Sequence, residues 1–238
     1  MKSVFLSDAH LFNEDENGYK NLLEFLSSIG DDVDELYIVG DFFDFWFCDS
    51  DRVYPGFRVM IDRLLEIKNK GVAISLFEGN HDFFLEDFFC RYGIDVYPED
   101  ATMKFDGMRL FVAHGDTVDT SNKRYLLLRR LLRSRAFYHL QSILPCRALW
   151  KIAEITSKIS KEHLAEPPEG MADKMEAFSH AKFKDGFDAV ILGHCHQPQI
   201  KQVLVKGRMR TFVTLGDWIS HFSYLLYDNG EFSMRNYS

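Results

Sequence analysis

The sequence lacks a hydrophobic run long enough to cross a membrane. No stretch of its 238 residues approaches the roughly 18 apolar residues that a spanning helix needs, and the apolar N-terminus meets a charge at Asp8. We therefore expect neither an anchor nor a cleaved signal, and a cytoplasmic location. Internal repeats and low-complexity segments are also missing, which excludes solenoids and fibrous or disordered proteins. Because α/β proteins of this length are commonly undivided, we expect residues 1–238 to form a single domain.

Cysteine is scarce, and its placement argues against both disulfide-bonded and zinc-ribbon proteins. The chain has four cysteines, far apart and without a Cys-x-x-Cys pair: Cys48, Cys90, Cys146 and Cys195. This spacing supports neither a disulfide framework nor a zinc ribbon, so we expect reduced thiols. Cys195 lies between two histidines, but we expect a buried thiol there rather than a metal ligand.

Positive charge is in the minority but is unevenly distributed. The 28 Lys and Arg stand against 36 Asp and Glu, a formal net charge of −8, which argues against a nucleic-acid binder. Between Lys123 and His163, however, ten Lys and Arg stand against two Glu, a net charge of +8. The remainder, with 18 basic and 34 acidic residues, stands at −16. One basic segment, also rich in Leu, Ile and aromatic residues, is thus set into an acidic body.

Strand and helix patterns alternate along the chain. Short β-branched or aromatic runs predict buried strands at 4–7, 36–39, 72–77, 109–113, 189–192 and 211–215. Apolar residues at helical spacing predict helices over 19–29 and 57–70, each followed by a glycine. Asp106-Gly107 and Asp228-Asn229-Gly230 are hairpin turn signals, so the sheet content should be mixed. The alternation predicts an α/β fold.

Most of the predicted strands end in side chains that bind metals. The five ends read Ser7-Asp8-Ala9-His10, Gly40-Asp41-Phe42-Phe43-Asp44, Gly79-Asn80-His81-Asp82, Ala113-His114-Gly115-Asp116 and Gly193-His194-Cys195-His196. Carboxyl ends of strands line one edge of an open α/β sheet, so residues over a hundred positions apart can meet there. Carboxylate, imidazole and amide donors together suit Mn²⁺, Fe or Zn²⁺ better than Ca²⁺. Seven candidate ligands are about right for two ions, which predicts hydrolysis of a phosphate ester or anhydride.

These five motifs, in this order, resemble those of the calcineurin-like metallophosphoesterases over most of the chain. The resemblance implies a four-layer sandwich of two mixed β-sheets flanked by helices, and two divalent ions, of which Mn²⁺ is the expected choice. It implies one ion held by Asp8, His10, Asp41 and His196, and a second held by Asp41, Asn80, His114 and His194. It implies two catalytic residues: His81, which would contact the phosphate oxygens, and Asp82, which would orient His81.

A narrower resemblance points to a nucleotide-linked lipid as substrate. The run from Gly40 to Trp46, and His114-Gly115-Asp116-Thr117 followed by Tyr125, are similar to the bacterial UDP-2,3-diacylglucosamine diphosphatases of lipid A synthesis. That similarity, together with the overall length and a helical insertion before the last histidine pair, implies cleavage of UDP-diacylglucosamine to a lipid monophosphate and UMP.

The spacing of the candidate ligands supports the insertion independently. The successive gaps along Asp8, Asp41, Asn80 and His114 are 33, 39 and 34 residues. The next gap, from His114 to His194, is 80 residues, an excess of about 40. The excess coincides with the basic segment, so we expect residues 120–166 to form a helical lid, here called the insertion. It would hold the acyl chains and rest on an anionic membrane, the cytoplasmic face of the inner membrane. Expected substrate contacts are Trp46, Tyr125, Arg129, Arg133, Ser160 and Lys161.

Several alternatives remain open at this level. The chain could be a soluble phosphodiesterase or phosphatase acting on nucleotides or phosphoproteins, or a non-catalytic scaffold with the same fold. The insertion could be a solvated helical face or a subunit interface. Trp46 could pack in the core rather than line a pocket. Asp44 and Asp116 are expected to brace their neighbours rather than bind metal, and His221 could approach the site from the C-terminal strands.

Overall fold

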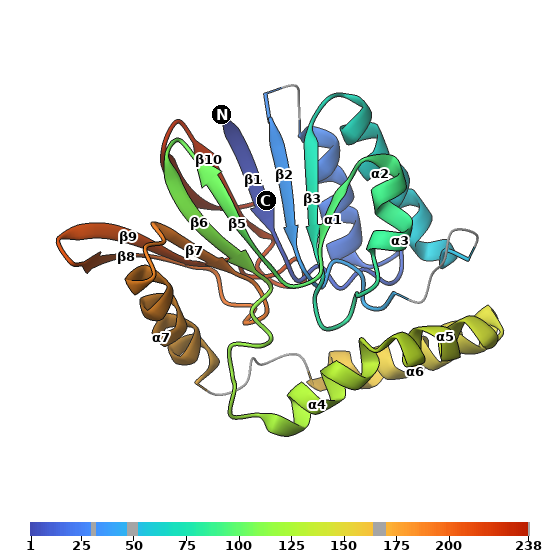
Figure 1. Cartoon of the computed structure of the whole chain (residues 1–238). Coiled ribbons are helices and arrows are strands. Elements are labelled where there is room, and N and C mark those ends of the chain that lie inside the picture. The colour runs from blue at the N-terminus through green and yellow to red at the C-terminus, as the bar shows by residue number, and fades with distance from the viewer. Residues whose placement is uncertain (30–31, 47–51, 164–169, 238) are drawn as a thin grey trace.

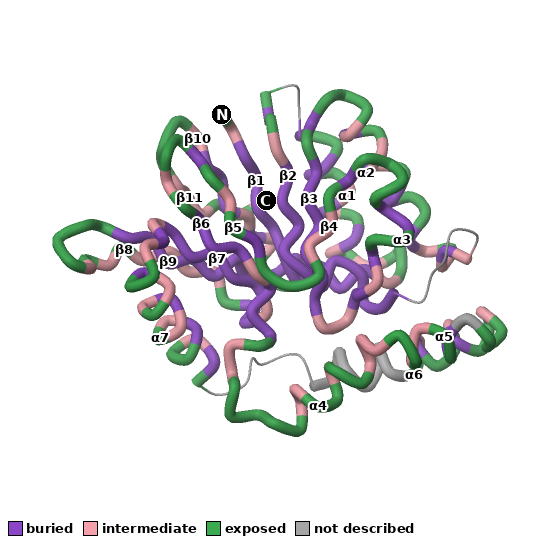
Figure 2. Tube along the Cα trace, in the orientation of Figure 1, coloured by how far each residue is buried: buried purple, intermediate pink, exposed green. Residues whose placement is uncertain are grey.

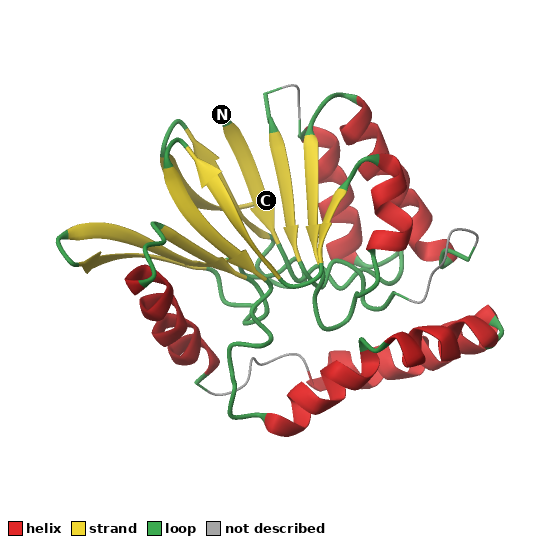
Figure 3. Ribbon diagram, viewed as in Figure 1, coloured by secondary structure: helices red, strands yellow, loops and turns green. Residues whose placement is uncertain are grey.

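The computed structural model describes residues 1–29, 32–46, 52–163 and 170–237, and only the backbone of Ser142 and of residues 156–163. Two β-sheets pack face to face and carry helices on their outer faces (Figures 1 and 3). The predicted α/β fold with two mixed sheets flanked by helices is confirmed.

The first sheet joins both ends of the chain. Its order is β11-β10-β1-β2-β3-β4, with β1 to β4 parallel and the β10–β11 hairpin antiparallel at the β1 edge. The strands are β1 (Lys2–Leu6), β2 (Glu35–Val39), β3 (Ala73–Phe77), β4 (Asp95–Tyr97), β10 (Ser223–Asp228) and β11 (Glu231–Asn236). The helices between them are α1 (Asn17–Ser28), α2 (Arg58–Asn69), which follows a short 3₁₀ turn at Pro55–Phe57, and α3 (Glu86–Phe89), followed by a second 3₁₀ turn at Cys90–Tyr92. The C-terminal hairpin turn predicted at Asn229-Gly230 is confirmed.

The second sheet has the order β5-β6-β7-β9-β8. Its strands are β5 (Asp100–Phe105), β6 (Met108–Ala113), β7 (Ala189–Leu192), β8 (Gln199–Val205) and β9 (Arg208–Thr214). The hairpin predicted at Asp106-Gly107 joins β5 and β6, with Phe105 opposite Met108. Strands β6, β7 and β9 run parallel, so their carboxyl ends share one edge.

Alternating side chains build four layers from these two sheets. Phe5 and Tyr37 stack at 4.5 Å between ring centroids and face the second sheet, which contributes Val112 and Ile191 to the same inner core. Neighbouring residues such as Leu6 point the other way, into the core beneath α1 and α2. On the outer face of the second sheet, α7 (Met171–Lys184) covers a third cluster. Period-two alternation in buried strands therefore produces a helix–sheet–sheet–helix sandwich, with the burial seen in Figure 2.

Trp46 belongs to the core beneath α1 and α2, which corrects the expectation that it lines a substrate pocket. Its side chain is 1% exposed, and it packs against Phe43, Phe57 and Phe89 with ring centroids 4.8, 6.1 and 5.3 Å away. A large aromatic ring gains more from full burial than from partial exposure in a pocket wall. Cys195 is likewise buried, in the apolar cluster covered by α7.

The described part of the insertion contains three helices that lie below the strand ends in Figure 1 and contact the sandwich at its loops. They are α4 (Lys123–Leu132), α5 (Arg135–Ile143) and α6 (Cys146–His163). Tyr138 of α5 contacts the ring of Phe84 at 4.9 Å, and Trp150 of α6 contacts that of Tyr54 at 5.6 Å. Among the described residues, no helix has both the length and the apolar character needed to cross a membrane.

Candidate metal centre

The loops that follow β1, β2, β3, β6 and β7 meet at one edge of the sandwich. Backbone hydrogen bonds join them: the Asp8 amide donates to the Gly40 carbonyl at 3.1 Å, and the Gly193 amide donates to the His114 carbonyl at 2.9 Å. The His194 amide donates to the Asp8 carboxylate at 2.9 Å, although the two residues are 186 positions apart. The strand ends singled out in the sequence therefore converge, as expected for the carboxyl edge of an α/β sheet.

Five of the seven candidate ligands adopt a left-handed backbone. The φ angles are +54° at Asp8, +43° at His10, +51° at Asp41, +65° at His194 and +56° at His196. Non-glycine residues avoid this region because their Cβ crowds the backbone, at a cost of about 1–2 kcal/mol each. Such strain gathers at functional sites, where the surrounding structure holds it in place. Here it turns five side chains that follow three strands, β1, β2 and β7, toward one space.

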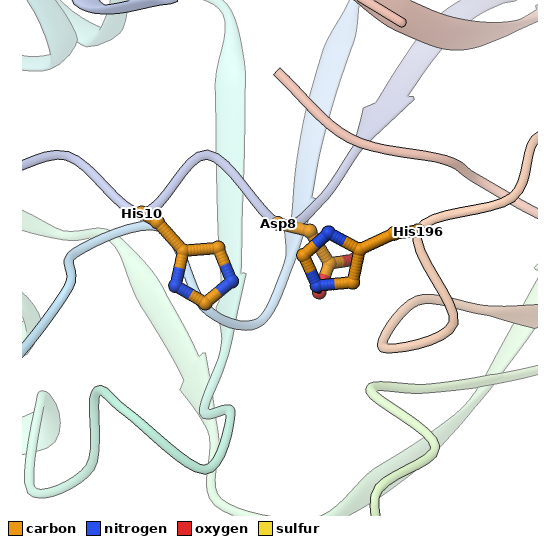
Figure 4. A group of neighbouring side chains, drawn as sticks. All are labelled: Asp8, His10 and His196. Carbon is orange, nitrogen blue, oxygen red and sulfur yellow. The ribbon is translucent and has the colours of Figure 1, made fainter. Parts of the chain in front are cut away.

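One cluster consists of Asp8, His10 and His196, whose donor atoms all lie within 4.8 Å of one another. Asp8 and His10 follow β1, and His196 reaches them from the loop after β7 (Figure 4). The Nε2 of His196 lies 3.6 Å from the Asp8 carboxylate, and the rings of His10 and His196 are 5.3 Å apart. Asp8 and His10 are almost wholly buried, so this cluster is shielded from solvent.

A second cluster consists of Asp41, His114 and His194, joined by Asn80. His114 Nε2 lies 3.3 Å from Asp41 Oδ2 and 3.1 Å from the Asn80 side-chain oxygen. The same Asp41 oxygen lies 3.7 Å from His10 Nε2, in the first cluster. Asp41 therefore stands between the two clusters and can contribute to both.

The charges around Asp41 favour its ionised form. Burial opposes ionisation, but the imidazoles of His114 and His81 outweigh it and hold the pKa of Asp41 well below its ordinary value. Burial likewise acts to lower the pKa of His114, but the negative charge of Asp41 raises that pKa to about 10. Burial lowers the pKa of His194 to about 4, which leaves its ring neutral and able to donate a lone pair. Asp41 is therefore held as a carboxylate, the form in which it can bind a cation.

The buried donor atoms fit divalent cations. Within the described residues, Asp8 Oδ1 and both ring nitrogens of His10 are buried and have no hydrogen-bond partner. A buried polar atom without a partner costs about 1–3 kcal/mol, a cost that a coordinated ion removes. Carboxylate, imidazole and amide donors in one site are the set that Mn²⁺, Fe and Zn²⁺ accept.

Two further carboxylates, Asp44 and Asp217, lie behind the candidate ligands. Asp44 Oδ1 is 3.4 Å from His10 Nδ1, and Asp217 Oδ2 is 3.6 Å from His196 Nδ1. A carboxylate on the far nitrogen of a ligating histidine fixes its tautomer and orientation. The place of Asp44 beside His10 agrees with the expectation that it braces its neighbours. We did not single out Asp217 from the sequence, although Gly216-Asp217 follows a strand just as Gly40-Asp41 does.

Asp217 is itself fixed by the loop that follows it. Its Oδ1 accepts hydrogen bonds from the backbone amides of Ile219, Ser220 and His221 at 3.0, 2.7 and 3.0 Å. His221 Nδ1 lies 3.0 Å from the other oxygen, so the alternative in which His221 approaches the site is realised through Asp217. Burial acts to raise the pKa of Asp217, but His196 and these amides more than offset it and lower that pKa.

Asp217→Asn is expected to weaken Mn²⁺ binding roughly 10- to 100-fold at the cluster that contains His196, because the His196 ring loses the carboxylate that orients it. Calorimetric titration of the metal-free protein with Mn²⁺ measures the effect. Asp173→Asn, on the exposed surface of α7, is the matched control. Unchanged affinity for both ions in D217N would show that the contact is dispensable.

Asp82 does not orient His81, which corrects the expectation drawn from the family resemblance. Its two oxygens accept backbone amides of Gly79 and of the loop after β2, at 2.9 Å from Gly79 and 2.8 Å from Phe42. Further amides come from Asp41 and Phe43. A buried carboxylate stabilises such converging amides, so Asp82 holds the loop that carries Asp41. His81 Nδ1 instead lies 3.1 Å from the backbone carbonyl of Asp44 and 3.8 Å from its carboxylate.

The expected substrate contacts from the insertion are engaged with the sandwich. The Tyr125 hydroxyl donates to Asp116 at 2.7 Å, and Arg129 Nε donates to the same oxygen at 2.6 Å. Arg133 donates to the Gly79 carbonyl at 2.7 Å. Ser160 and Lys161 fall in α6, but their side chains lie outside the described residues.

Comparison with known proteins gives a consistent result. A family model described as calcineurin-like phosphoesterase matches residues 1–198. A UDP-2,3-diacylglucosamine hydrolase of Neisseria gonorrhoeae is 31% identical over 233 residues, 96% of this chain and 95% of its own length. One of the same name from Stenotrophomonas maltophilia is 30% identical over 98% of both chains. The solved structure of a novel archaeal phosphodiesterase, 14% identical, covers 99% of both chains with a TM-score of 0.52, which shows a shared fold.

Proposed function

The chain belongs to the calcineurin-like phosphoesterase family, and on that premise we propose that it hydrolyses the pyrophosphate bond of UDP-2,3-diacylglucosamine, releasing UMP and a lipid monophosphate. It is a metal-dependent hydrolase of phosphate ester or anhydride bonds. Relatives about 30% identical over nearly the full chain carry the name of this reaction. Within the chain, the observation that supports a lipid substrate is the exposed apolar face of the insertion.

In this proposal two Mn²⁺ ions occupy the two clusters. Asp8, His10, Asp41 and His196 would hold one ion, and Asp41, Asn80, His114 and His194 the other, with Asp41 shared. Dications in such a pair activate water and neutralise charge that develops on phosphoryl oxygens. Two observations support this assignment: buried atoms of Asp8 and His10 have no hydrogen-bond partner, and Asp41 lies between the two clusters.

His81 would act on the phosphate in this site. The carbonyl of Asp44 can only accept a hydrogen bond, so His81 Nδ1 carries the proton that it donates there. The opposite nitrogen, Nε2, is left to donate a proton or hydrogen bond to the leaving oxygen when the ring is protonated. Such general-acid help is typically worth about 10²–10⁴ in rate. The ring lies beside His10, with centroids 4.7 Å apart, so it stands next to the proposed ions.

The insertion supplies the lipid side of the proposal. Helix α4 turns Tyr125 and Arg129 toward the sandwich and three leucines outward: Leu127, Leu128 and Leu131 are 70%, 52% and 61% exposed. Of the 14 large apolar side chains that are exposed among the described residues, eight lie between Leu127 and Ile155. Exposed apolar surface of this kind marks a contact site, and here it coincides with the +8 segment. An amphiphile that bears a diphosphate matches both properties.

A second proposed contact of the same surface is the membrane that holds the substrate. Apolar side chains flanked by Lys and Arg bind anionic lipid surfaces, each cation adding about 1 kcal/mol near the membrane. The protein would then work as a peripheral enzyme on the cytoplasmic face of the inner membrane. The helices of the insertion lie on the side of the sandwich where the strands carrying the candidate ligands end (Figure 1), so a substrate held by the insertion would be near the metal centre.

The proposal is tested with UDP-2,3-diacylglucosamine in mixed micelles and with water-soluble UDP-glucose and bis-p-nitrophenyl phosphate, in Mn²⁺ after chelation. We expect UMP release from the lipid with kcat/KM at least about 100-fold above UDP-glucose, a difference of about 2.7 kcal/mol. The double variant Leu127→Gln, Leu131→Gln should lose most of this preference and keep its turnover of bis-p-nitrophenyl phosphate.

Each alternative has its own outcome in this assay. Turnover confined to the two water-soluble substrates would replace the lipid with a nucleotide or another soluble phosphodiester. Absence of turnover with two ions bound would indicate a scaffold. A double variant that retains the full lipid preference would remove the insertion from substrate recognition.

A further inference from the structure

The inward face of α4 holds the loops that carry two candidate metal ligands. Tyr125, Arg129 and Arg133 recur every four residues, so they lie on one side of the helix. Arg129 and Tyr125 meet Asp116, two residues after His114, and Arg133 meets the segment just before Asn80. The loops that carry Asn80 and His114, two members of the second cluster, are thus both hydrogen-bonded to the insertion.

Arg133 forms three hydrogen bonds with the segments that flank β3 and β4. Its guanidinium donates to the carbonyl of Gly79 at 2.7 Å, to the carboxylate of Glu78 at 2.9 Å and to the carbonyl of Pro98 at 2.8 Å. The side chain is only 11% exposed. A guanidinium held by three acceptors in fixed directions defines the position of all three, which a flexible surface ion pair does not.

The segment that Arg133 holds lies directly against Asp41. A Cβ added to Gly79 would stand 2.1 Å from Asp41 Oδ1, so the Gly79 backbone already touches that carboxylate. The amide of His81 donates to the same oxygen at 2.8 Å. A shift of the Gly79 carbonyl is therefore transmitted to Asn80, His81 and Asp41 together.

Glu78 explains why a cation is required at this point. Its carboxylate is buried, accepts the Leu85 amide at 2.8 Å and forms a salt bridge with Arg133 at 2.9 Å. Without Arg133 the buried carboxylate would lose its partner, which is strongly destabilising, and the end of β3 would have to rearrange.

Arg129 fastens the other loop in a similar way. It donates through Nε to Asp116 at 2.6 Å and through both terminal nitrogens to Glu99 at 3.0 and 2.9 Å. Asp116 is buried, and Glu99 belongs to the same segment as Pro98, which Arg133 contacts. The two arginines therefore span the space between the loops after β3 and β6.

We propose that Arg133 is a positioning residue of the metal centre: through the Gly79 carbonyl and Glu78 it holds Asn80 and His81 in register with Asp41, so that α4 is an integral part of the phosphoesterase site. This inference rests on the metal-binding part of the proposed function and is independent of the lipid. It predicts that hydrolysis of a small water-soluble phosphodiester, which has no use for a lipid-binding surface, still depends on a side chain of the insertion.

The test uses the full chain and three variants, Arg133→Gln, Arg133→Lys and Arg130→Gln. Arg130 lies on the same helix but is exposed, so R130Q is the matched control. Hydrolysis of bis-p-nitrophenyl phosphate is followed over a Mn²⁺ titration, Mn²⁺ binding to the metal-free protein is measured by calorimetry, and Tm is recorded without metal. For R133Q we expect kcat to fall and the Mn²⁺ concentration at half activation to rise, each roughly 10- to 100-fold. R130Q should match the wild type, and R133K should fall between them.

The outcomes separate positioning from general stability and from the lipid proposal. If R133Q binds Mn²⁺ and turns over like the wild type, or if R130Q loses as much, the proposal is overturned. Should R133Q not fold, R133K decides, because it keeps the positive charge: unchanged half activation in R133K would equally overturn the proposal. A wild-type protein that cleaves bis-p-nitrophenyl phosphate but not UDP-2,3-diacylglucosamine would remove the lipid substrate and leave the comparison of variants intact.

Discussion

Asp41→Asn is expected to lower kcat at least about 1000-fold, the range reached when one preorganised charge-stabilising group is removed from an active site. Asp41 Oδ2 stands 3.3 Å from His114 and 3.7 Å from His10, so a single oxygen serves both clusters. A neutral amide cannot supply that shared negative charge. The measurement is turnover of bis-p-nitrophenyl phosphate together with the number of Mn²⁺ ions bound per chain.

The fold should survive this substitution. The amide of His81 donates to Asp41 Oδ1, which an asparagine oxygen can replace, and the loop amides stay on Asp82. Asp62→Asn, on the exposed side of α2, is the control for loss of one carboxylate. Two tightly bound ions or near-normal turnover in D41N would refute the sharing of Asp41 between the clusters.

Gly79→Ala is expected to inactivate the enzyme by displacing Asp41 without changing any donor atom. The added Cβ would lie 2.1 Å from Asp41 Oδ1 and 2.4 Å from the Asp41 backbone nitrogen, closer than atoms can approach. Either the loop after β2 or the end of β3 must shift, and both carry ligands. We expect a loss of at least about 100-fold in kcat, the scale of a 1 Å misplacement, with about 1–3 kcal/mol of overpacking strain. Phosphodiester turnover and denaturant unfolding measure the two effects.

Gly71→Ala separates the two effects. Gly71 has a φ of +100° and nothing within 4 Å of an added Cβ, so alanine there is strained but meets no neighbour. It should cost about 1 kcal/mol in unfolding free energy and leave turnover unchanged. A G79A protein as active as G71A would mean that the Asp41 carboxylate tolerates displacement, and the site geometry described above would be wrong.

The parts of this protein that local pattern determines were predictable. Strands such as β2 and β7 are short apolar runs that end in Gly-Asp or Gly-His, and the parallel topology brings those ends together wherever they occur in the chain. The hairpins at Gly107 and Gly230 follow from turn chemistry. The convergence of Asp8 with His194 also depends on the packing of the two sheets, because β1 and β7 belong to different sheets.

The contacts that depend on three-dimensional packing were not predictable. A tryptophan after a ligand motif looks the same whether it lines a pocket or fills the core, and Trp46 does the latter. Asp82 follows His81 directly, but adjacent residues in a turn need not face each other. The Asp82 carboxylate accepts hydrogen bonds from backbone amides instead. The partners of Arg133 and of Asp217 lie 54 and 21 residues away, a choice that no local pattern encodes.

The pairing of β1 with β10 sets the order in which the protein can be completed during synthesis. Lys2 pairs with Asp228, so β1 has an open edge until the C-terminal hairpin, which follows every other strand of both sheets, has emerged from the ribosome. The Trp218 amide, which donates to the Asp8 carbonyl, and Asp217 beside it arrive just before that hairpin. Contacts this distant in sequence form slowly. From the emergence of β1 until that of β10, the nascent chain therefore carries an incomplete sheet and an incomplete metal centre. A chain that stops before β10 would leave one edge of β1 unpaired and exposed to aggregation.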